Sequence, residues 1–205
     1  MKYFSQSGFR LSTVRLGQVD LQAPVSLPGL EVAIQQVVSH PSFTNNPVAV
    51  YDIALVKMER PVAFTDMIRP ICVFQDVEDV QRELVVAGWG RTEKARSSSV
   101  LQFTSLEQVE REDCEAEYRE AGQQGRLGPL TDGLAILPSQ LCARGEDKTD
   151  SCSGDSGGPL MSRADKWYLT GLVSFGTNEC DSSLPGVYTS VSFFYDWILE
   201  TLQNT

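Results

Sequence analysis

Gly154-Asp155-Ser156-Gly157-Gly158-Pro159 is the stretch of this sequence on which the interpretation of the fold depends. Glycine adopts backbone angles with φ > 0 at little steric cost, so a glycine-rich turn can point several of its own N–H groups at one place. Such a turn would expose the hydroxyl of Ser156 beside donors that stabilise a developing oxyanion. A tight turn with an ordinary serine is the alternative, but six specified residues in a row favour a nucleophile.

Length and charge limit the classes of partner. The chain has 205 residues, enough for one large domain or two small lobes with a sizeable core. Its net charge of −10 argues against nucleic acid, whose affinity depends on neutralising phosphates with Lys and Arg. No apolar run approaches the roughly 18–20 residues that a membrane span needs. We therefore expect neither a nucleic-acid nor a membrane partner.

Cysteine usage indicates an oxidising compartment. The sequence has five cysteines, so at least one has no partner within the chain. None of the spacings is the short pair typical of zinc sites, and we expect no metal and no cofactor. Disulfides are rare in reducing compartments. The first ten residues contain no apolar segment of a signal peptide, which conflicts with secretion and suggests an incomplete N-terminus.

Short β-rich stretches separated by turn residues predict an all-β barrel or sandwich. They cover residues 31–38, 52–58, 83–90, 167–175 and 186–191. Residues 91–99 and 121–138 have the composition of exposed loops.

Two helices are expected. One is short and covers residues 113–118. The other closes the chain, with Ser192 as N-cap and an apolar face that includes Phe194, Trp197 and Leu202.

The serine motif also matches the nucleophile elbow of α/β-hydrolases. That elbow needs a helix after the serine and a histidine further along the chain. Residues 159–175 instead have strand character, and the one histidine, His40, precedes the serine. The elbow is therefore rejected.

Along its length the sequence resembles the trypsin/chymotrypsin-like serine proteases, whose catalytic triad is a worked example of nucleophilic catalysis. The motifs that carry the resemblance occur in the family's order: Asp52-Ile53-Ala54-Leu55, Pro70-Ile71-Cys72, Ala87-Gly88-Trp89-Gly90, residues 150–160, Ser174-Phe175-Gly176, Pro185-Gly186-Val187-Tyr188 and Asp196-Trp197-Ile198. The resemblance implies one peptidase domain over 1–205, built as a two-lobed antiparallel β-barrel with a C-terminal helix. Its parts would be an incomplete N-terminal barrel at 1–72, a C-terminal barrel at 73–191 and the helix at 192–203.

The resemblance assigns a role to each matching residue. Ser156 is the implied nucleophile, Asp52 the acid that orients a catalytic imidazole, and the N–H groups of Gly154 and Ser156 the oxyanion hole. Asp150 is the implied base of a pocket for the Arg or Lys of a protein or peptide substrate.

Further implied substrate contacts are the pocket walls, Gly176 and Gly186, and the edge from Ser174 that pairs with substrate backbone. Asp155 matches the acid that binds a freed N-terminal amine; without that amine it would need another partner or adopt a zymogen-like arrangement. Taken one at a time, Asp52 is better interpreted as a turn residue and Asp150 as a surface acid, whereas together and in register the residues favour the implied roles.

The resemblance also suggests how the cysteines are used. It implies the disulfides Cys114–Cys142 and Cys152–Cys180. Cys72 matches a position that bonds to a propeptide or regulatory chain, and it is unpaired within this chain. The layout most resembles arthropod clip-domain proteases, which implies an extracellular protein of a proteolytic cascade.

The family's Ala-Ala-His-Cys motif and its Ile-Val-Gly-Gly start do not occur in this sequence. His40 lies in a His-Pro pair that is common in the family as a surface loop, so we interpret it as structural. Three hypotheses follow: a trypsin-like endopeptidase represented by a fragment, a non-catalytic homologue that acts as a regulatory or binding module, and a disulfide-stabilised binding domain unrelated to proteases. For this chain we expect negligible turnover.

Overall fold

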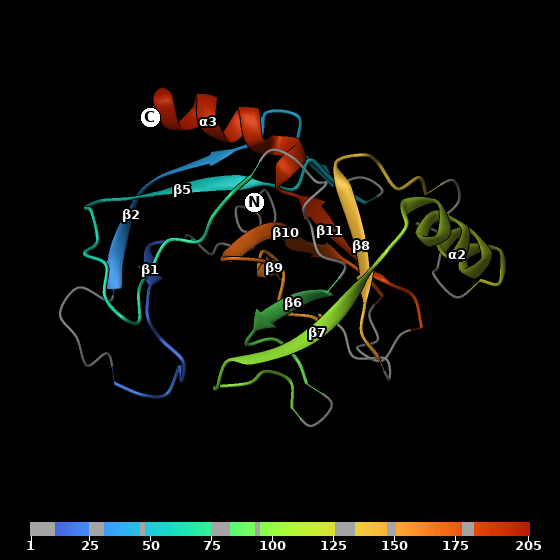
Figure 1. Ribbon diagram of the computed structural model, residues 1–205, viewed down its shortest axis with the longest axis horizontal. Coiled ribbons are helices and arrows are strands. Elements are labelled where there is room, and N and C mark those ends of the chain that lie inside the picture. The colour runs from blue at the N-terminus through green and yellow to red at the C-terminus, as the bar shows by residue number, and fades with distance from the viewer. Residues whose placement is uncertain are drawn as a thin grey trace.

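A computed structural model describes residues 11–24, 31–45, 48–74, 83–92, 95–125, 134–146, 151–177 and 183–205. These residues form mostly β-strands, as expected, with helices at the middle and the end of the chain (Figure 1).

Six antiparallel strands close into a barrel in the second half of the chain. In order around the barrel they are β10 (Trp167–Phe175), β11 (Gly186–Ser190), β8 (Gln140–Arg144), β7 (Gln102–Val109), β6 (Glu83–Gly88) and β9 (Pro159–Arg163), which pairs back onto β10. Closure leaves no unpaired sheet edge. The predicted strands over 83–90, 167–175 and 186–191 are confirmed as β6, β10 and β11.

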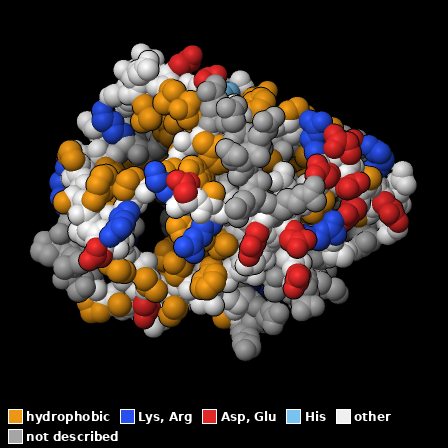
Figure 2. Space-filling view, in the orientation of Figure 1, with side chains coloured by type: hydrophobic (Ala, Val, Ile, Leu, Met, Phe, Trp, Pro, Cys, Tyr) orange, Lys and Arg blue, Asp and Glu red, His pale blue; other side chains and the backbone are white. Residues whose placement is uncertain are grey.

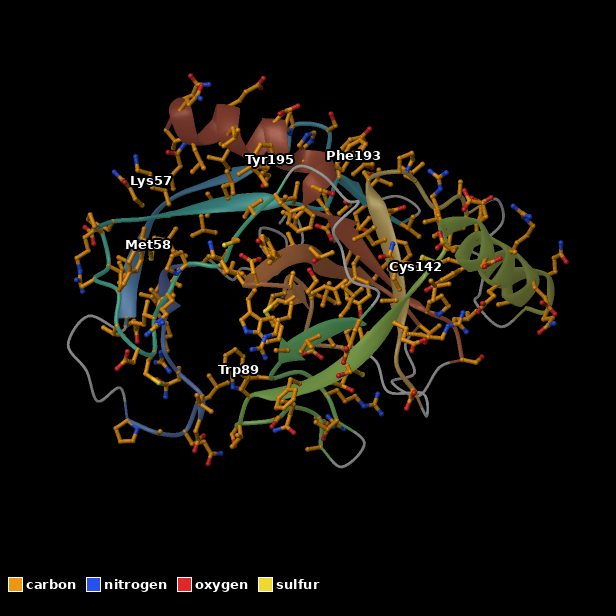
Figure 3. The ribbon with its side chains drawn as sticks, in the orientation of Figure 1. Lys57, Met58, Trp89, Cys142, Phe193 and Tyr195 are labelled. Carbon is orange, nitrogen blue, oxygen red and sulfur yellow. A yellow bond between two sulfur atoms is a disulfide. The ribbon has the colours of Figure 1, made fainter. Side chains whose placement is uncertain are left out.

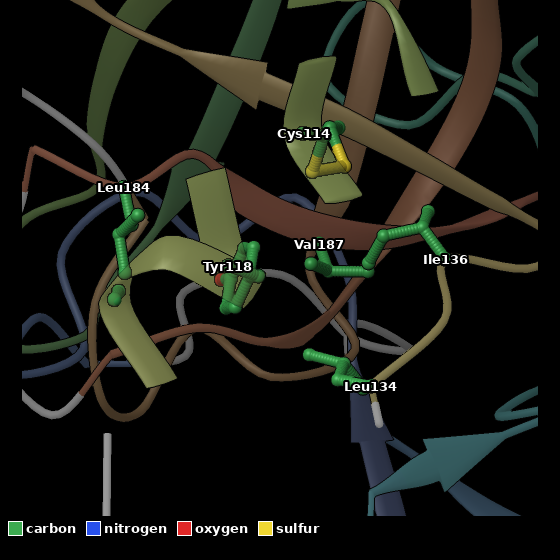
Figure 4. Packing of buried hydrophobic residues seen from close by; sticks show 8 residues of the cluster. Cys114, Tyr118, Leu134, Ile136, Leu184 and Val187 are labelled. Carbon is green, nitrogen blue, oxygen red and sulfur yellow. A yellow bond between two sulfur atoms is a disulfide. The ribbon is translucent and has the colours of Figure 1, made fainter. Parts of the chain in front are cut away.

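Alternate residues of these strands fill the barrel. The buried cluster consists of Leu84, Val86, Leu106, Ala143, Leu160, Val173 and Tyr188. Because successive side chains of a strand point to opposite faces, Val187 turns outward while Tyr188 turns inward. Val187 therefore belongs to a second cluster between the barrel and helix α2 (Figure 4).

The first part of the chain forms an open sheet instead of a barrel. Strand β2 (Glu31–Ser39) pairs with β1 (Thr13–Arg15) on one side and β5 (Ala54–Met58) on the other, all antiparallel. A two-stranded ladder of β3 (Thr44–Asn45) and β4 (Ala49–Val50) lies between β2 and β5 in the sequence. Within the part of the chain that the structure describes, this sheet has three strands.

Helix α2 (Arg111–Gln123) is longer than the six residues predicted for it. Its buried residues, Cys114, Tyr118 and Ala121, recur at helical spacing and continue past the predicted end. Residues 121–123, expected in a loop, therefore belong to the helix. The Tyr118 hydroxyl donates to the Pro185 carbonyl at 2.8 Å, and acidic side chains gather on the outer surface of α2 (Figure 2).

The chain ends in a short 3₁₀ turn, η3 (Ser192–Phe194), and helix α3 (Tyr195–Gln203). The prediction that Ser192 caps this helix is wrong. Ser192 begins η3, and the N-cap position of α3 is Phe194, which makes no side-chain capping hydrogen bond. Helix α3 lies across β2 and β5, where the Lys57 ammonium donates to the Thr205 carbonyl (Figures 1 and 3). Among the described residues no helix is long and apolar enough to cross a membrane.

The Cys114–Cys142 disulfide joins α2 to β8, and both residues are buried. Replacing both with alanine should lower the free energy of unfolding by about 3–4 kcal/mol, because the bridge closes a loop with a sequence separation of 28. Urea titration monitored by circular dichroism measures this loss. Cys72→Ala is the matched control, since Cys72 is a free thiol. Equal stability of the control and the double variant would contradict the expectation.

Candidate active site

Asp52 precedes β5 and follows a residue with unusual backbone geometry. Tyr51 has φ of 53°, and the Ile53 N–H donates back to the Tyr51 carbonyl at 2.9 Å. A non-glycine residue in this region costs on the order of 1–3 kcal/mol, which surrounding contacts must offset. The rings of His40 and Phe194 supply such contacts, with centroids 5.1 and 5.6 Å from that of Tyr51. Packing of these aromatic rings therefore sets the direction in which the chain enters Asp52.

Two hydroxyl groups of the closed barrel hold Asp52. Ser174 of β10 donates to carboxylate oxygen Oδ2 at 2.9 Å, and Thr189 of β11 donates to the Asp52 carbonyl at 3.0 Å. The register between β10 and β11 shifts between Val173 and Phe175, so Ser174 is the extra residue of a β-bulge. A bulge redirects a side chain relative to a regular strand. Here the redirected hydroxyl connects the barrel to the open sheet.

Ser156 is exposed on the loop between β8 and β9. Reciprocal hydrogen bonds attach this loop to β10: the Gly157 N–H donates to the Val173 carbonyl at 2.8 Å and the Val173 N–H to the Gly158 carbonyl at 2.9 Å. Gly154 requires its glycine, because its φ is 102° and an added Cβ would lie 3.1 Å from the Gly90 Cα. Within the described residues, the N–H groups of Gly154 and Ser156 have no acceptor, so both are free to bind an oxyanion.

Asp155 folds back under the loop instead of facing solvent. Its Oδ1 accepts the Gly90 N–H at 2.8 Å and its Oδ2 accepts the Cys152 N–H at 3.0 Å. A Cβ added to Gly88 would lie 2.0 Å from Oδ1 of Asp155. A Cβ added to Gly90 would lie 2.5 Å from the carboxyl carbon of Asp155. The partner that the sequence left open for Asp155 is thus a pair of backbone amides. In the sequence, the glycines on both sides of Trp89 were the available signal that Asp155 packs closely against this segment.

The structure brings Asp52, Ser156 and Ser174 to one cleft of about 600 Å³. Apolar side chains supply much of the wall: Leu11, Phe43, Ile53, Leu172, Val173 and Phe175. The predicted nucleophile and the predicted acid, 104 positions apart in the sequence, therefore line a common space. Phe43 and Leu172 are lining residues that the sequence motifs did not identify.

Only some residues of the predicted substrate pocket lie within the described part of the chain. A Cβ added at Gly176 would lie 3.9 Å from the Gly186 Cα, so the two implied wall residues face one another. Asp150 and Cys180 lie outside the described residues. Next to Asp150, the Ser151 hydroxyl lies 3.0 Å from the Tyr188 hydroxyl.

The described cysteines have the disulfide states that the family resemblance implies. The Cys114–Cys142 bridge is present, and Cys152 is disulfide-bonded. Cys72 is free and partly exposed, and its backbone pairs with β10 near Trp167. Among the described residues, no three His, Cys, Asp or Glu side chains gather as metal ligands.

His40 is held away from the lining of the cleft by an aromatic cluster. Its ring stacks on Tyr51 and lies 5.1 Å from Phe194 and 5.0 Å from Trp197, between centroids. Its Nδ1 accepts the Ser42 N–H at 3.2 Å. Burial lowers the pKa of His40, so the ring is neutral at pH 7. These contacts agree with the structural interpretation of His40.

Gly90→Ala should lower the free energy of unfolding by about 1–3 kcal/mol, because the added methyl would overlap the Asp155 carboxylate. Chemical denaturation measures the change. In an Asp155→Ala background the same substitution should cost less, and the difference between backgrounds isolates the contact. The same cost in both backgrounds would show that the crowding at Gly90 does not come from Asp155.

Comparison with known proteins agrees with this geometry. The trypsin family model matches residues 10–198. Serine protease 7 of Drosophila melanogaster is 38% identical over 94% of the chain and 50% of its own length. Phenoloxidase-activating factor 1 of Holotrichia diomphalia is 40% identical over 82% of the chain and 45% of its own length. The CLIP domain-containing serine protease HP8 of Bombyx mori is 35% identical over 97% of the chain and 55% of its own length. The chain spans about half the length of these relatives. It belongs to the trypsin family of serine proteases and is related to the clip-domain proteases of insects.

Proposed function

We propose that this site is the catalytic centre of an endopeptidase that cleaves protein substrates after Arg or Lys. The observation that carries the proposal is the shared cleft of Ser156 and Asp52, with Asp52 oriented by Ser174. Two free N–H groups beside Ser156 would stabilise the oxyanion of the tetrahedral intermediate. Gly176 and Gly186, which face one another, would form walls without side chains, and the carboxylate of Asp150 would pair with the substrate cation.

Ser156 needs a base to become a good nucleophile, and this chain holds its one histidine elsewhere. General-base catalysis contributes typically about 10²–10⁴-fold to a rate. We therefore expect the 205-residue chain by itself to bind substrate but to hydrolyse it at a negligible rate. Turnover of an arginine ester near that of trypsin, abolished by Ser156→Ala, would contradict this expectation.

The position of His40 also supports a second candidate, a non-catalytic homologue that binds protein partners in a regulatory role. The two candidates differ in what they require of Asp52, Asp150 and Ser156. An endopeptidase needs all three, whereas a binding module needs none of their chemistry. The ordered contacts of Asp52 favour the endopeptidase.

An extracellular cascade role follows from the relatives, one of which is named for activating phenoloxidase. The disulfides fit an oxidising compartment. The partly exposed Cys72 thiol would bond to a propeptide or clip domain.

Binding of p-aminobenzamidine tests the pocket independently of any base, because its amidinium group imitates the arginine side chain. We expect a fluorescence change on binding that Asp150→Asn weakens about 10–100-fold, the equivalent of a charged hydrogen bond. Asp66→Asn is the matched control, since that carboxylate is almost fully exposed and far in sequence from the site. Unchanged affinity in Asp150→Asn would remove the proposed specificity.

The structural role of His40 predicts a pH dependence of stability. The folded pKa is lowered, so the unfolded chain binds more protons between the folded pKa and about 6.5. Stability from the neutral ring is therefore complete above pH 6.5 and is lost as the pH falls through that window. Urea unfolding at several pH values should show this loss in the native chain and not in His40→Phe. Parallel profiles for the two proteins would contradict the prediction.

A further inference from the structure

Asp52 is the centre of a tight turn, and His40 contacts the residues on both sides of it. The Ile53 N–H donates to the Tyr51 carbonyl at 2.9 Å, so the chain turns at Asp52. On one side, the His40 ring stacks on that of Tyr51, with centroids 5.1 Å apart and an interplanar angle of 20°. On the other side, the His40 backbone N–H donates to the Ile53 carbonyl at 3.0 Å. A single residue therefore supports both ends of the turn that carries Asp52.

Tyr51 depends on its aromatic neighbours because its backbone is strained. Its φ of 53° lies in the left-handed region, which a residue with a bulky side chain rarely adopts. Its ring contacts those of His40, Phe193 and Phe194, with centroids 5.1, 6.4 and 5.6 Å away. One aromatic pair contributes a free energy comparable to the cost of one such strained residue. Loss of the stacked pair with His40 would therefore remove a contribution of the size that keeps Tyr51 left-handed.

The surroundings of His40 suit the neutral ring and not the protonated one. Its Nδ1 accepts the Ser42 N–H at 3.2 Å, which requires an unprotonated nitrogen. A protonated ring carries an N–H on both nitrogens, so two donors would face each other at Ser42. The rings of Tyr51, Phe194 and Trp197 also displace water from the imidazole. Protonation therefore costs the Ser42 contact and favours a ring that has moved into water.

No charge among the described residues offsets this cost. The elements packed against His40 carry these titratable side chains: Tyr51, Asp52, Lys57, Tyr195, Asp196 and Glu200. Within the described part of the chain, none of them forms an ion pair with His40. Burial lowers the pKa of His40, and no charged group contributes to the shift.

We propose that His40 is a proton-operated switch for Asp52: when the ring takes up a proton from solution, Tyr51 leaves its left-handed conformation and the turn at Asp52 opens. The Asp52 carboxylate then moves away from the Ser174 hydroxyl, which it contacts at 2.9 Å in the closed turn. The proton is the only reactant, and its return to solution closes the turn again. The inference goes beyond the proposed function, because it concerns the position of Asp52 whatever reaction the cleft performs.

A wall of the cleft moves with the switch. The Phe43 N–H donates to the His40 carbonyl at 3.1 Å, so the two residues belong to one turn. Phe43 lines the cleft together with Asp52. The cleft is therefore assembled at neutral pH, and two of its lining residues are displaced in acid.

Acid favours the open turn. In the open turn the imidazole is in water and has its ordinary pKa of about 6.5, whereas in the closed turn its pKa is lowered. Between these two values the open turn binds more protons. Its population therefore rises as the pH falls through this window, by up to about tenfold per pH unit. Above about pH 6.5 both forms carry a neutral ring, and the population no longer depends on pH.

Hydrogen exchange of single amides, followed by NMR in the full chain, tests the switch without a measurement of activity. The Ile53 N–H reports the turn, because it donates to the Tyr51 carbonyl. The Leu169 N–H, which donates to the Cys72 carbonyl at 2.8 Å, reports the barrel. After correction for intrinsic exchange, protection of Ile53 should fall at least about tenfold from about pH 7.5 to about pH 5. Protection of Leu169 should change much less.

Two variants separate the switch from other effects of acid. His40→Phe keeps an aromatic ring against Tyr51 but cannot be protonated, so Ile53 should retain its protection in acid. Tyr51→Gly adopts the left-handed conformation without support. In that variant, protection of Ile53 should be independent of pH although the ring protons of His40 still show a titration. Asp66→Asn is the matched control, since that carboxylate is almost fully exposed, and it should behave as the native chain does.

Three results overturn the proposal. Unchanged protection of Ile53 in the native chain across the titration of His40 would show that the ring is protonated without moving Tyr51. An equal loss of protection in His40→Phe would assign the effect to another group. An equal loss in Tyr51→Gly would show that the charge acts without the strained backbone. Binding of p-aminobenzamidine tests the pocket at Asp150 separately, so failure of the switch and failure of the proposed function are distinguished.

Discussion

The hydroxyls of Ser174 and Thr189 hold Asp52 from the side of the closed barrel, while Asp52 itself lies just before β5 of the open sheet. Its backbone direction is set by Tyr51, whose left-handed conformation depends on His40 and Phe194. The two lobes and the C-terminal segment therefore meet at one carboxylate. The cleft depends on this arrangement, because Asp52 supplies one of its walls and Ser156 another.

The loop of Ser156 is stabilised differently, through its own backbone and Asp155. The carboxylate accepts two amide hydrogens, from Gly90 and Cys152, and leaves no room for side chains at Gly88 or Gly90. Charge-assisted hydrogen bonds of this kind are stronger than those between neutral groups. They fix the loop that carries the N–H groups of Gly154 and Ser156, which have no acceptor among the described residues.

Sequence reasoning succeeded where local pattern and burial agree. Strands β6, β10 and β11 are apolar or β-branched and were predicted, whereas β7 was missed because most of its residues are polar and its Phe103 side chain is 78% exposed. Helix α2 exceeded its prediction because packing of Ala121 continued the helix. The predicted cap at Ser192 was wrong because a 3₁₀ turn precedes α3, whose N-cap position is Phe194 and carries no side-chain cap.

The sequence by itself determined the family, the order of the motifs and the identity of the implied nucleophile and acid, because these are properties of residue type and spacing. Tertiary structure alone decided the bulge that aims Ser174, the amides that bind Asp155 and the aromatic cluster around His40. These contacts join residues 122, 65 and up to 157 positions apart. No local pattern specifies such pairs, since each exists only once the barrel has closed and the C-terminal helix has packed.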